Sequence, residues 1–177
     1  MDQTAVPEDW DLHFKAIWVE LHHLLKESGA ATAILLDATG NAVTYAGEDP
    51  DFDLSTFASL AVGDYVATQE LASILGHGQS RWVVHQGIKG GMVLVPVHPL
   101  LILGVLFDSR TTLGLVRHEI RRAKDRLLVT VEPVLRLIEE QLARGESEDE
   151  RPSPVAVGEA ADRAVDQGLM ELFGPAS

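Results

Sequence analysis

The side chains of this sequence that could do chemistry are first its histidines and carboxylates, because together these two types could bind a metal ion. The chain has seven histidines. His22 and His23 are adjacent and therefore point in different directions on a helix, and no His-x-x-x-His pair occurs. Asp49, Asp51 and Asp53 resemble a calcium loop only superficially, since its glycine and terminal glutamate are missing. We expect no metal site.

Patterns that would support nucleophilic catalysis or phosphate binding are also missing. The chain has no cysteine, no Gly-x-Ser-x-Gly elbow, and no glycine-rich loop with a lysine at a helix start. Residues 87–91 (GIKGG) fit a hairpin turn, in which Gly90 and Gly91 would permit positive φ angles. These observations predict an interaction module with no catalytic residue and no cofactor of its own.

The charge of the chain is unevenly distributed. Its net charge is −13, with 5 basic and 14 acidic residues in 1–110, 7 and 5 in 111–144, and 2 and 8 in 145–177. The overall acidity argues against nucleic acid or an anionic membrane as a partner. The basic residues of the middle zone lie on a predicted helix, which is either a solvated face or a docking site for an acidic protein surface. They are Arg117, Arg121, Arg122, Lys124 and Arg126.

The first half of the chain predicts a helix, a hairpin and a second helix. Residues 10–28 form an amphipathic helix, with one side that we expect to be buried. That side consists of Phe14, Ile17, Trp18, Leu21, Leu24 and Leu25. Residues 31–37 and 42–46 are two strands joined by a turn at 38–41. The second helix spans residues 53–76, capped by Asp53 or Ser55 and stopped by Gly76.

This second helix has more apolar surface than one sheet can cover. Its apolar and alanine positions span about 240° of the helical circumference, far more than one core-facing stripe needs. A chain of this size offers a sheet to one side only. The other side therefore requires a second copy of the chain or another partner.

The second half of the chain predicts three strands and a long helix. The strands are residues 81–86, 92–97 and 100–107, and the last is apolar on both faces, which places it centrally in a sheet. The helix begins after a cap at Ser109 or Thr111, and Pro133 must kink or divide it. Its buried stripe is Leu113, Val116, Ile120, Ala123, Leu127 and Val131.

The expected organisation is one α+β domain followed by a tail. The domain covers residues 1–143 and has a sheet with helices on its faces. Residues 144–158 are a charged, proline-bearing linker without periodicity. Residues 159–177 contain a possible amphipathic helix that is too short to be stable in water until it docks. No membrane-spanning segment is expected, and the absence of cysteine fits the cytoplasm.

Several segments together resemble the bacterial roadblock/LC7 family, most closely its MglB type. The most specific is FDSRTTLGLVR at residues 107–117, and it is joined by HQG at residues 85–87. The others are HFKAIWVELHHLL, LLDATGNAVTYAG and DLSTFASLAVGDYVA. The similarity covers roughly residues 12–130, and the tail segment AVDQGLMELF also resembles the distal part of that family.

This resemblance implies a homodimeric roadblock fold. It has a five-stranded antiparallel sheet, one long helix between strands 2 and 3, and flanking N- and C-terminal helices. The sheet would extend across the two protomers, with the middle helix and the strand after it at the seam. On this chain the implied dimer interface is Leu60, Leu71, Ile74, Trp82 and Val84.

The resemblance also implies a partner, namely a Ras-like polarity GTPase of the MglA type, which would carry GTP and Mg. MglB-like proteins stimulate its GTP hydrolysis without an arginine finger, by moving the GTPase's own residues into place. The implied GTPase-binding platform is a stripe on the middle helix: Ser59, Gly63, Val66, Ala67 and Glu70. The tail helix would make a second contact through Val165, Leu169, Leu172 and Phe173.

Three functions remain open. The first is a GTPase-activating regulator, found in the cytoplasm with concentration at a cell pole as a further expectation. The second is a roadblock adaptor that binds other polarity or motility proteins without stimulating hydrolysis. It stays open because Val66 and Glu70 stand where MglB-type platforms favour alanine or glycine. The third is a small-molecule enzyme. Arg110 could suggest an arginine finger, but its place after Asp108 at a helix start fits a structural ion pair better.

Overall fold

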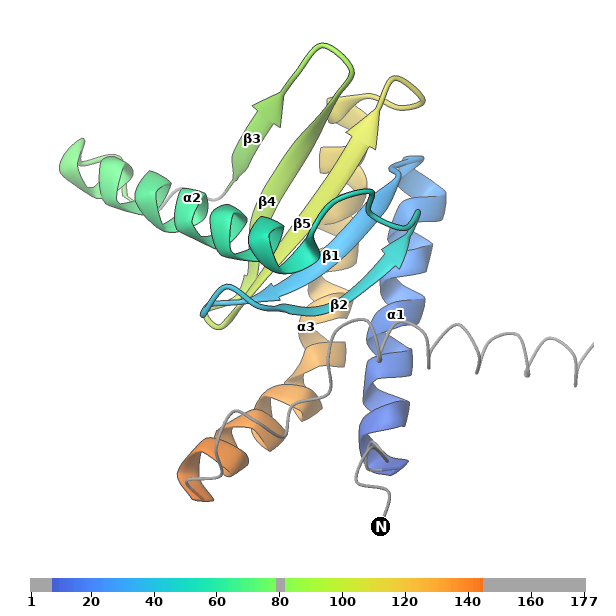
Figure 1. The fold of residues 1–177 in the computed structure, drawn as a ribbon, viewed down its shortest axis with the longest axis vertical. Coiled ribbons are helices and arrows are strands. Elements are labelled where there is room, and N and C mark those ends of the chain that lie inside the picture. Colours follow the sequence, from blue (N-terminus) through green and yellow to red (C-terminus); the bar gives the residue numbers. More distant parts are fainter. Residues whose placement is uncertain (1–7, 79–81, 145–177) are drawn as a thin grey trace, which may run out of the picture.

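The structure is a computed structural model that describes residues 8–78 and 82–144. Along the chain it contains eight elements, drawn in Figure 1: α1 (Glu8–Ser28), β1 (Thr32–Asp37), β2 (Ala42–Gly47), α2 (Leu54–Ile74), β3 (Val83–Gln86), β4 (Gly90–His98), β5 (Leu101–Asp108) and α3 (Leu113–Arg144). The strands form one antiparallel sheet in the order β2-β1-β5-β4-β3. The predicted α+β class is confirmed, as are the central position of β5 and the single long helix between the second and third strands.

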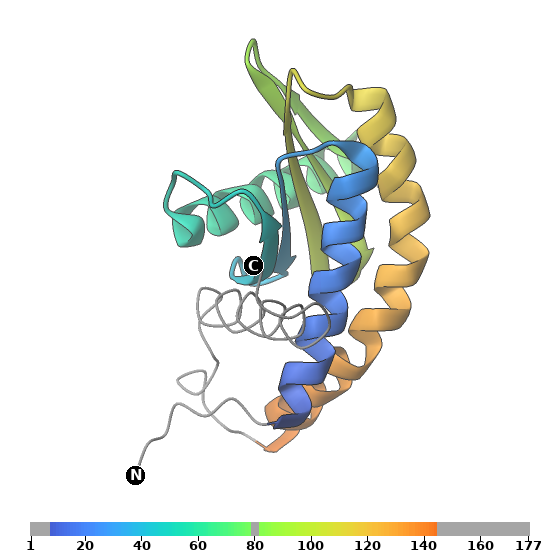
Figure 2. The same ribbon diagram turned by 90° about the vertical axis from the view of Figure 1, so that its right-hand side faces the viewer.

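The helices cover the sheet unequally. α1 and α3 lie side by side on one face, and α2 crosses the other face (Figure 2). The main core lies under α1 and α3, and all six α1 side chains expected there are buried. The expected stripe of α3 is equally well confirmed, because Val116, Ile120, Ala123, Leu127 and Val131 have no exposed surface, and Leu113 packs against the same core.

One expectation about α3 needs correction and another is confirmed. Neither Ser109 nor Thr111 caps it, because the Thr112 hydroxyl accepts a hydrogen bond from the Leu115 amide at 3.3 Å, while the Thr111 hydroxyl donates to the Ser28 carbonyl at 2.5 Å. Of the two effects expected of Pro133, a kink or a division, the kink is found, because the helix continues through Pro133 to Arg144 and bends in its last part (Figure 1). A proline removes one helical hydrogen bond, and a helix can survive this as a bend.

Gly90 and Gly91, which the sequence places in the turn, instead lie inside β4. Neither has a positive φ, and they pair with Asp108 and Phe107 of β5. A Cβ atom on Gly91 would lie 2.5 Å from Cζ of Phe107. Glycine is therefore required here for close packing of the Phe107 ring, which is a use that hairpin turn rules do not reveal.

Other predictions fall outside the described part of the chain. These are the structure of residues 145–158 and of the expected tail helix, including Val165, Leu169, Leu172 and Phe173. Within the described ranges, no helix is long and apolar enough to cross a membrane. Within the same ranges, no group of three or more histidine, aspartate or glutamate side chains is placed to hold a metal ion.

Candidate partner-binding surface

α2 begins at the predicted cap and is attached to the sheet by a small core. The Asp53 carboxylate accepts a hydrogen bond from the Thr56 amide at 2.6 Å, and the hydrogen bonds from Thr56 lower the pKa of Asp53. Only Ala58, Ala61 and Val62 of the helix are fully buried. Small side chains bury little area, so α2 is held less firmly by apolar packing than α1 or α3.

A polar turn between β1 and β2 supports the first half of α2. The Asp37 carboxylate accepts hydrogen bonds from both the amide and the side chain of Thr39 and of Asn41. Gly40, at a φ of 94°, approaches α2 so closely that a Cβ atom on it would lie 3.2 Å from Cα of Ser59. The Ser59 hydroxyl also donates to the Gly40 carbonyl at 3.3 Å. The turn therefore fixes the position of Ser59.

A second polar contact supports the other half of α2. Nε2 of His85, on β3, lies 2.6 Å from Oδ2 of Asp64. β3 pairs with β4 and lies at one end of the sheet order, so its outer edge has no strand partner among the described residues. Figure 1 shows α2 crossing the sheet and extending past the β3 side. The contact therefore joins the free edge of the sheet to the middle helix.

The residues predicted to bind a GTPase share the outward face of α2 with three of those predicted to form the dimer. Ser59, Gly63, Val66, Ala67 and Glu70 are all exposed. Leu60, Leu71 and Ile74 are 69%, 60% and 80% exposed. Helical spacing places these eight residues on one continuous surface opposite the sheet. A patch with this much exposed apolar surface is a candidate interaction site.

On this face, the presence of a glycine at position 63 is not explained by the fold of the chain. A Cβ atom there would meet nothing within 4 Å. Gly63 lies in the interior of a regular helix, where glycine costs about 1 kcal/mol relative to alanine. No turn, packing contact or positive φ in the described structure requires glycine at this position.

Trp82 and Val84 lie apart from this face. Val84 pairs with Val93, whose side chain belongs to the core under α1 and α3, and Trp82 packs against that same core. They therefore lie on the opposite face of the sheet from α2, beside the β3 edge. Arg117 and Arg121 of α3 sit over the Trp82 ring, with their Cζ atoms 5.3 and 5.8 Å from its centroid.

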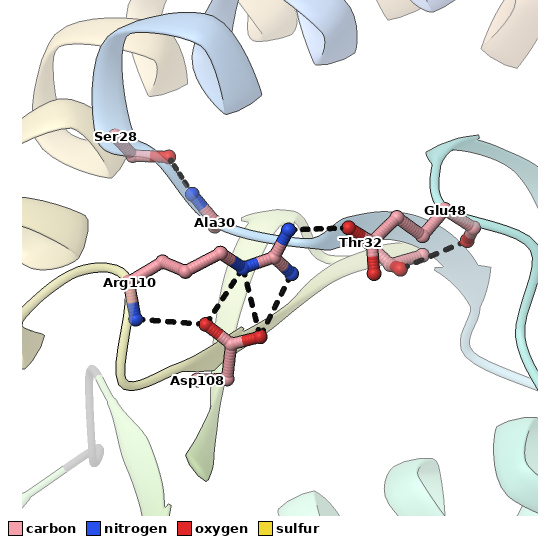
Figure 3. Close-up of polar contacts among 6 residues, drawn as sticks. All are labelled: Ser28, Ala30, Thr32, Glu48, Asp108 and Arg110. Carbon is pink, nitrogen blue, oxygen red and sulfur yellow. Dashed lines mark hydrogen bonds and ion pairs between the residues drawn. The ribbon is translucent and has the colours of Figure 1, made fainter.

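Arg110 is held by two carboxylates. It forms ion pairs with Glu48 at 2.5 Å and Asp108 at 2.8 Å, and its Nε also donates to Asp108 (Figure 3). Hydrogen bonds from Arg110 lower the pKa of Glu48 and of Asp108, and the two carboxylates raise the pKa of Arg110. Nearby, the Thr32 hydroxyl donates to the Glu48 carbonyl at 3.0 Å. The structural ion pair expected at Arg110 is confirmed, and it joins the ends of β2 and β5.

Sequence reasoning missed three features of this region. It did not single out Val62 as a buried residue of α2, and it found neither the His85 to Asp64 contact nor the two arginines on Trp82. These pairs are far apart in the sequence, so no local spacing rule indicates them. Side chains alternate between the two faces along a strand. This rule could have placed Trp82 and Val84 on one face of the sheet and Val83 on the other.

The fold can be compared with those of known proteins. No family model matches the chain, and no curated protein matches it. The crystal structure of a Roadblock/LC7 domain from Streptomyces avermitilis has the same fold, with a TM-score of 0.56, 22% identity, and coverage of 67% of this chain and 96% of that one. The class is the roadblock/LC7 fold.

Two more similar structures narrow this class. Myxococcus xanthus MglB is 32% identical, with a TM-score of 0.62 and coverage of 66% of this chain and 95% of that chain. The gliding protein MglB from Thermus thermophilus is 30% identical, with a TM-score of 0.63 and coverage of 68% of this chain and 92% of that chain. This chain belongs to the roadblock/LC7 family, in its MglB-like group.

Proposed function

We propose that this chain is a homodimeric regulator that binds a Ras-like small GTPase of the MglA type and stimulates its GTP hydrolysis. The proposal is supported by the family and by the outward face of α2. The observation that carries it is Gly63, which is an exposed helix-interior glycine with open space around it. A glycine that costs stability without serving its own protomer is explained if another chain packs closely against the helix there.

The state of the arginines supports a mechanism without an arginine finger. Arg110 is engaged by Asp108 and Glu48, and releasing it would leave two carboxylates without their cation. Arg117 and Arg121 lie on the other face of the sheet from α2. Stimulation through α2 would therefore act by rearranging the catalytic residues that the GTPase already has. α2 would contribute a surface for the GTPase to pack against and no catalytic side chain.

Homodimerisation accounts for the rest of the apolar face. Leu60, Leu71 and Ile74 lie beside the proposed platform, and the β3 edge offers unpaired backbone groups that a second copy could pair with. Leu71→Asp should give a folded monomer in molar-mass chromatography. Leu12→Asp, at an equally exposed position of α1, should leave the dimer intact. A dimer that survives Leu71→Asp unchanged would remove this surface from the seam.

A scaffold function is the second candidate, and two residues favour it. Val66 is 51% exposed and Glu70 is exposed, so both project from the platform, where a bulky or charged side chain limits close approach. A scaffold would bind the GTPase, or another polarity protein, and leave the hydrolysis rate unchanged. Equilibrium binding and single-turnover hydrolysis, measured on the same samples, distinguish the two functions.

A further inference from the structure

Three cations follow one flank of α3. Arg117, Arg121 and Lys124 recur at intervals of four and three residues, which places them in one row on the helix surface. Leu128 continues the row by four residues and is 38% exposed. The row borders Trp82, next to the free edge of β3. It lies on the other face of the sheet from the proposed GTPase platform.

These cations have no carboxylate partner among the described residues. Arg122, Arg126 and Arg136 of the same helix are paired with Glu119, Glu20 and Glu132. Within the described part of the chain, the partner found for Arg117 and for Arg121 is the Trp82 ring. In addition, Nε of Arg117 is buried and makes no hydrogen bond in the described structure. Unpaired guanidinium groups beside an aromatic ring are suited to bind carboxylates.

The chain itself contains a segment with complementary charges. Glu159, Asp162 and Asp166 recur at intervals of three and four residues, which is the spacing of the cationic row in reverse. In a helix they would share one face. A helix running antiparallel to α3 would set Glu159 against Lys124, Asp162 against Arg121, and Asp166 against Arg117.

The chain length allows this antiparallel pairing. Lys124 precedes the end of α3 at Arg144 by twenty residues, which is about 30 Å of helix. Residues 145–158 can span up to about 45 Å when extended, so a segment that starts at Glu159 can return to Lys124. The nearer acidic run, residues 146–150, reaches only about 20 Å from Arg144 and cannot reach the row.

We infer that the acidic face of residues 159–166 docks on the row formed by Arg117, Arg121 and Lys124 of the same chain. Docking supplies the carboxylates that the arginines lack and a surface on which so short a helix becomes stable. The inference does not depend on the proposed GTPase function. The acidic side chains it uses are separate from the apolar ones expected to contact a GTPase, which include Val165 and Leu169.

The test uses the full-length chain, whose lack of cysteine allows a single labelling site. A nitroxide is attached to Ala160→Cys, and amide signals are measured by NMR in isotope-enriched protein. The expected result is loss of signal intensity for residues 117–128 of α3. The loss should disappear in the variant Glu159→Gln, Asp162→Asn, Asp166→Asn, and at about 1 M salt, where the screening length is about 3 Å.

Two controls make the result specific. Neutralising Glu146, Glu148 and Asp149 should leave the signal loss in place, because these residues cannot reach the row. Arg121→Glu should abolish the loss, and adding Asp162→Arg should restore it.

The inference is wrong if the amide signals of residues 117–128 lose no intensity. It is also wrong if neutralising Glu146, Glu148 and Asp149 removes the loss as fully as neutralising Glu159, Asp162 and Asp166. It is also wrong if the loss disappears when the labelled protein is diluted with unlabelled, unenriched chain, because the segment would then be reaching another copy.

Discussion

Nε2 of His85 lies 2.6 Å from Oδ2 of Asp64, and this contact joins the edge strand β3 to the middle helix α2. The proposed dimer seam would use both of these elements, and α2 also carries the proposed GTPase platform. Both side chains are partly exposed, at 54% and 36%. An exposed pair of this kind contributes less than about 1 kcal/mol to global stability, so its effect should be local.

His85→Ala should therefore loosen the second half of α2 without unfolding the domain. We expect faster amide hydrogen exchange over residues 64–74 and little change in the exchange of β5 or α3. His98→Ala, at the last residue of β4, where the ring accepts a hydrogen bond from the Leu100 amide, is the matched control. Unchanged exchange in α2 would show that the contact does not position the helix.

Acid should weaken the domain through the cluster around Arg110. The pKa values of Asp108 and Glu48 are lowered in the folded state by hydrogen bonds from Arg110. A lowered carboxyl pKa stabilises the fold above the unfolded pKa, here near the ordinary values of 3.8 and 4.5. That stability is lost as the pH falls through the lower folded values.

Arg110→Gln tests this effect. The variant should be less stable than the parent at neutral pH, and the difference in the free energy of unfolding should shrink as the pH falls below about 4. Urea denaturation between neutral and acid pH measures it. A difference that stays constant over this range would mean that the ion pairs do not contribute.

Thr44 has a buried hydroxyl that makes no hydrogen bond in the described structure. Thr44→Val keeps the shape and removes the unsatisfied group, so we expect it to raise the free energy of unfolding by about 1 kcal/mol. The matched control is Thr32→Val, because the Thr32 hydroxyl donates to the Glu48 carbonyl at 3.0 Å and its loss should destabilise. Destabilisation of both variants alike would indicate that Thr44 has a partner.

Gly63→Ala should change stability and binding in opposite directions. The added Cβ meets nothing within 4 Å, so the helix should gain about 1 kcal/mol. If another chain packs against Gly63, the same methyl group should weaken its binding. Gly91→Ala, where a Cβ would lie 2.5 Å from Phe107, should instead destabilise the fold. Binding that is unaffected by Gly63→Ala would mean that no partner approaches closely there.

The outer helices can be predicted well from the sequence because each has one buried stripe. The spacing of Ile17, Leu21 and Leu24 in α1, and of Ile120 and Leu127 in α3, agrees with burial in the structure. α2 is harder to predict, because apolar residues surround it while its own sheet buries only three small side chains fully. Its surplus of apolar surface indicates an interaction but does not show which part of the helix each partner would contact.

What the sequence cannot predict depends on contacts between distant segments. Local turn rules place Gly91 in a turn. The reason for glycine at this position is the close approach of the Phe107 ring, which arises only when β4 and β5 pair. Thr111 has the residue type of a helix cap, but its hydroxyl donates a hydrogen bond to the carbonyl of Ser28, which is far away in the sequence. Thr112 caps the helix instead. The His85 contact with Asp64 likewise requires α2 to cross the sheet near β3.

The most direct test of the proposed function is single-turnover GTP hydrolysis by a Ras-like GTPase from the same genome. The rate is measured for the GTPase alone, and for the GTPase with this chain, with the Gly63→Arg variant, and with the Val129→Arg variant, which is a control at an exposed site of α3. We predict faster hydrolysis with the parent chain and with Val129→Arg, and no stimulation with Gly63→Arg, which should still form the dimer. An unchanged rate with a parent chain that binds the GTPase, or full stimulation by Gly63→Arg, would contradict the proposal.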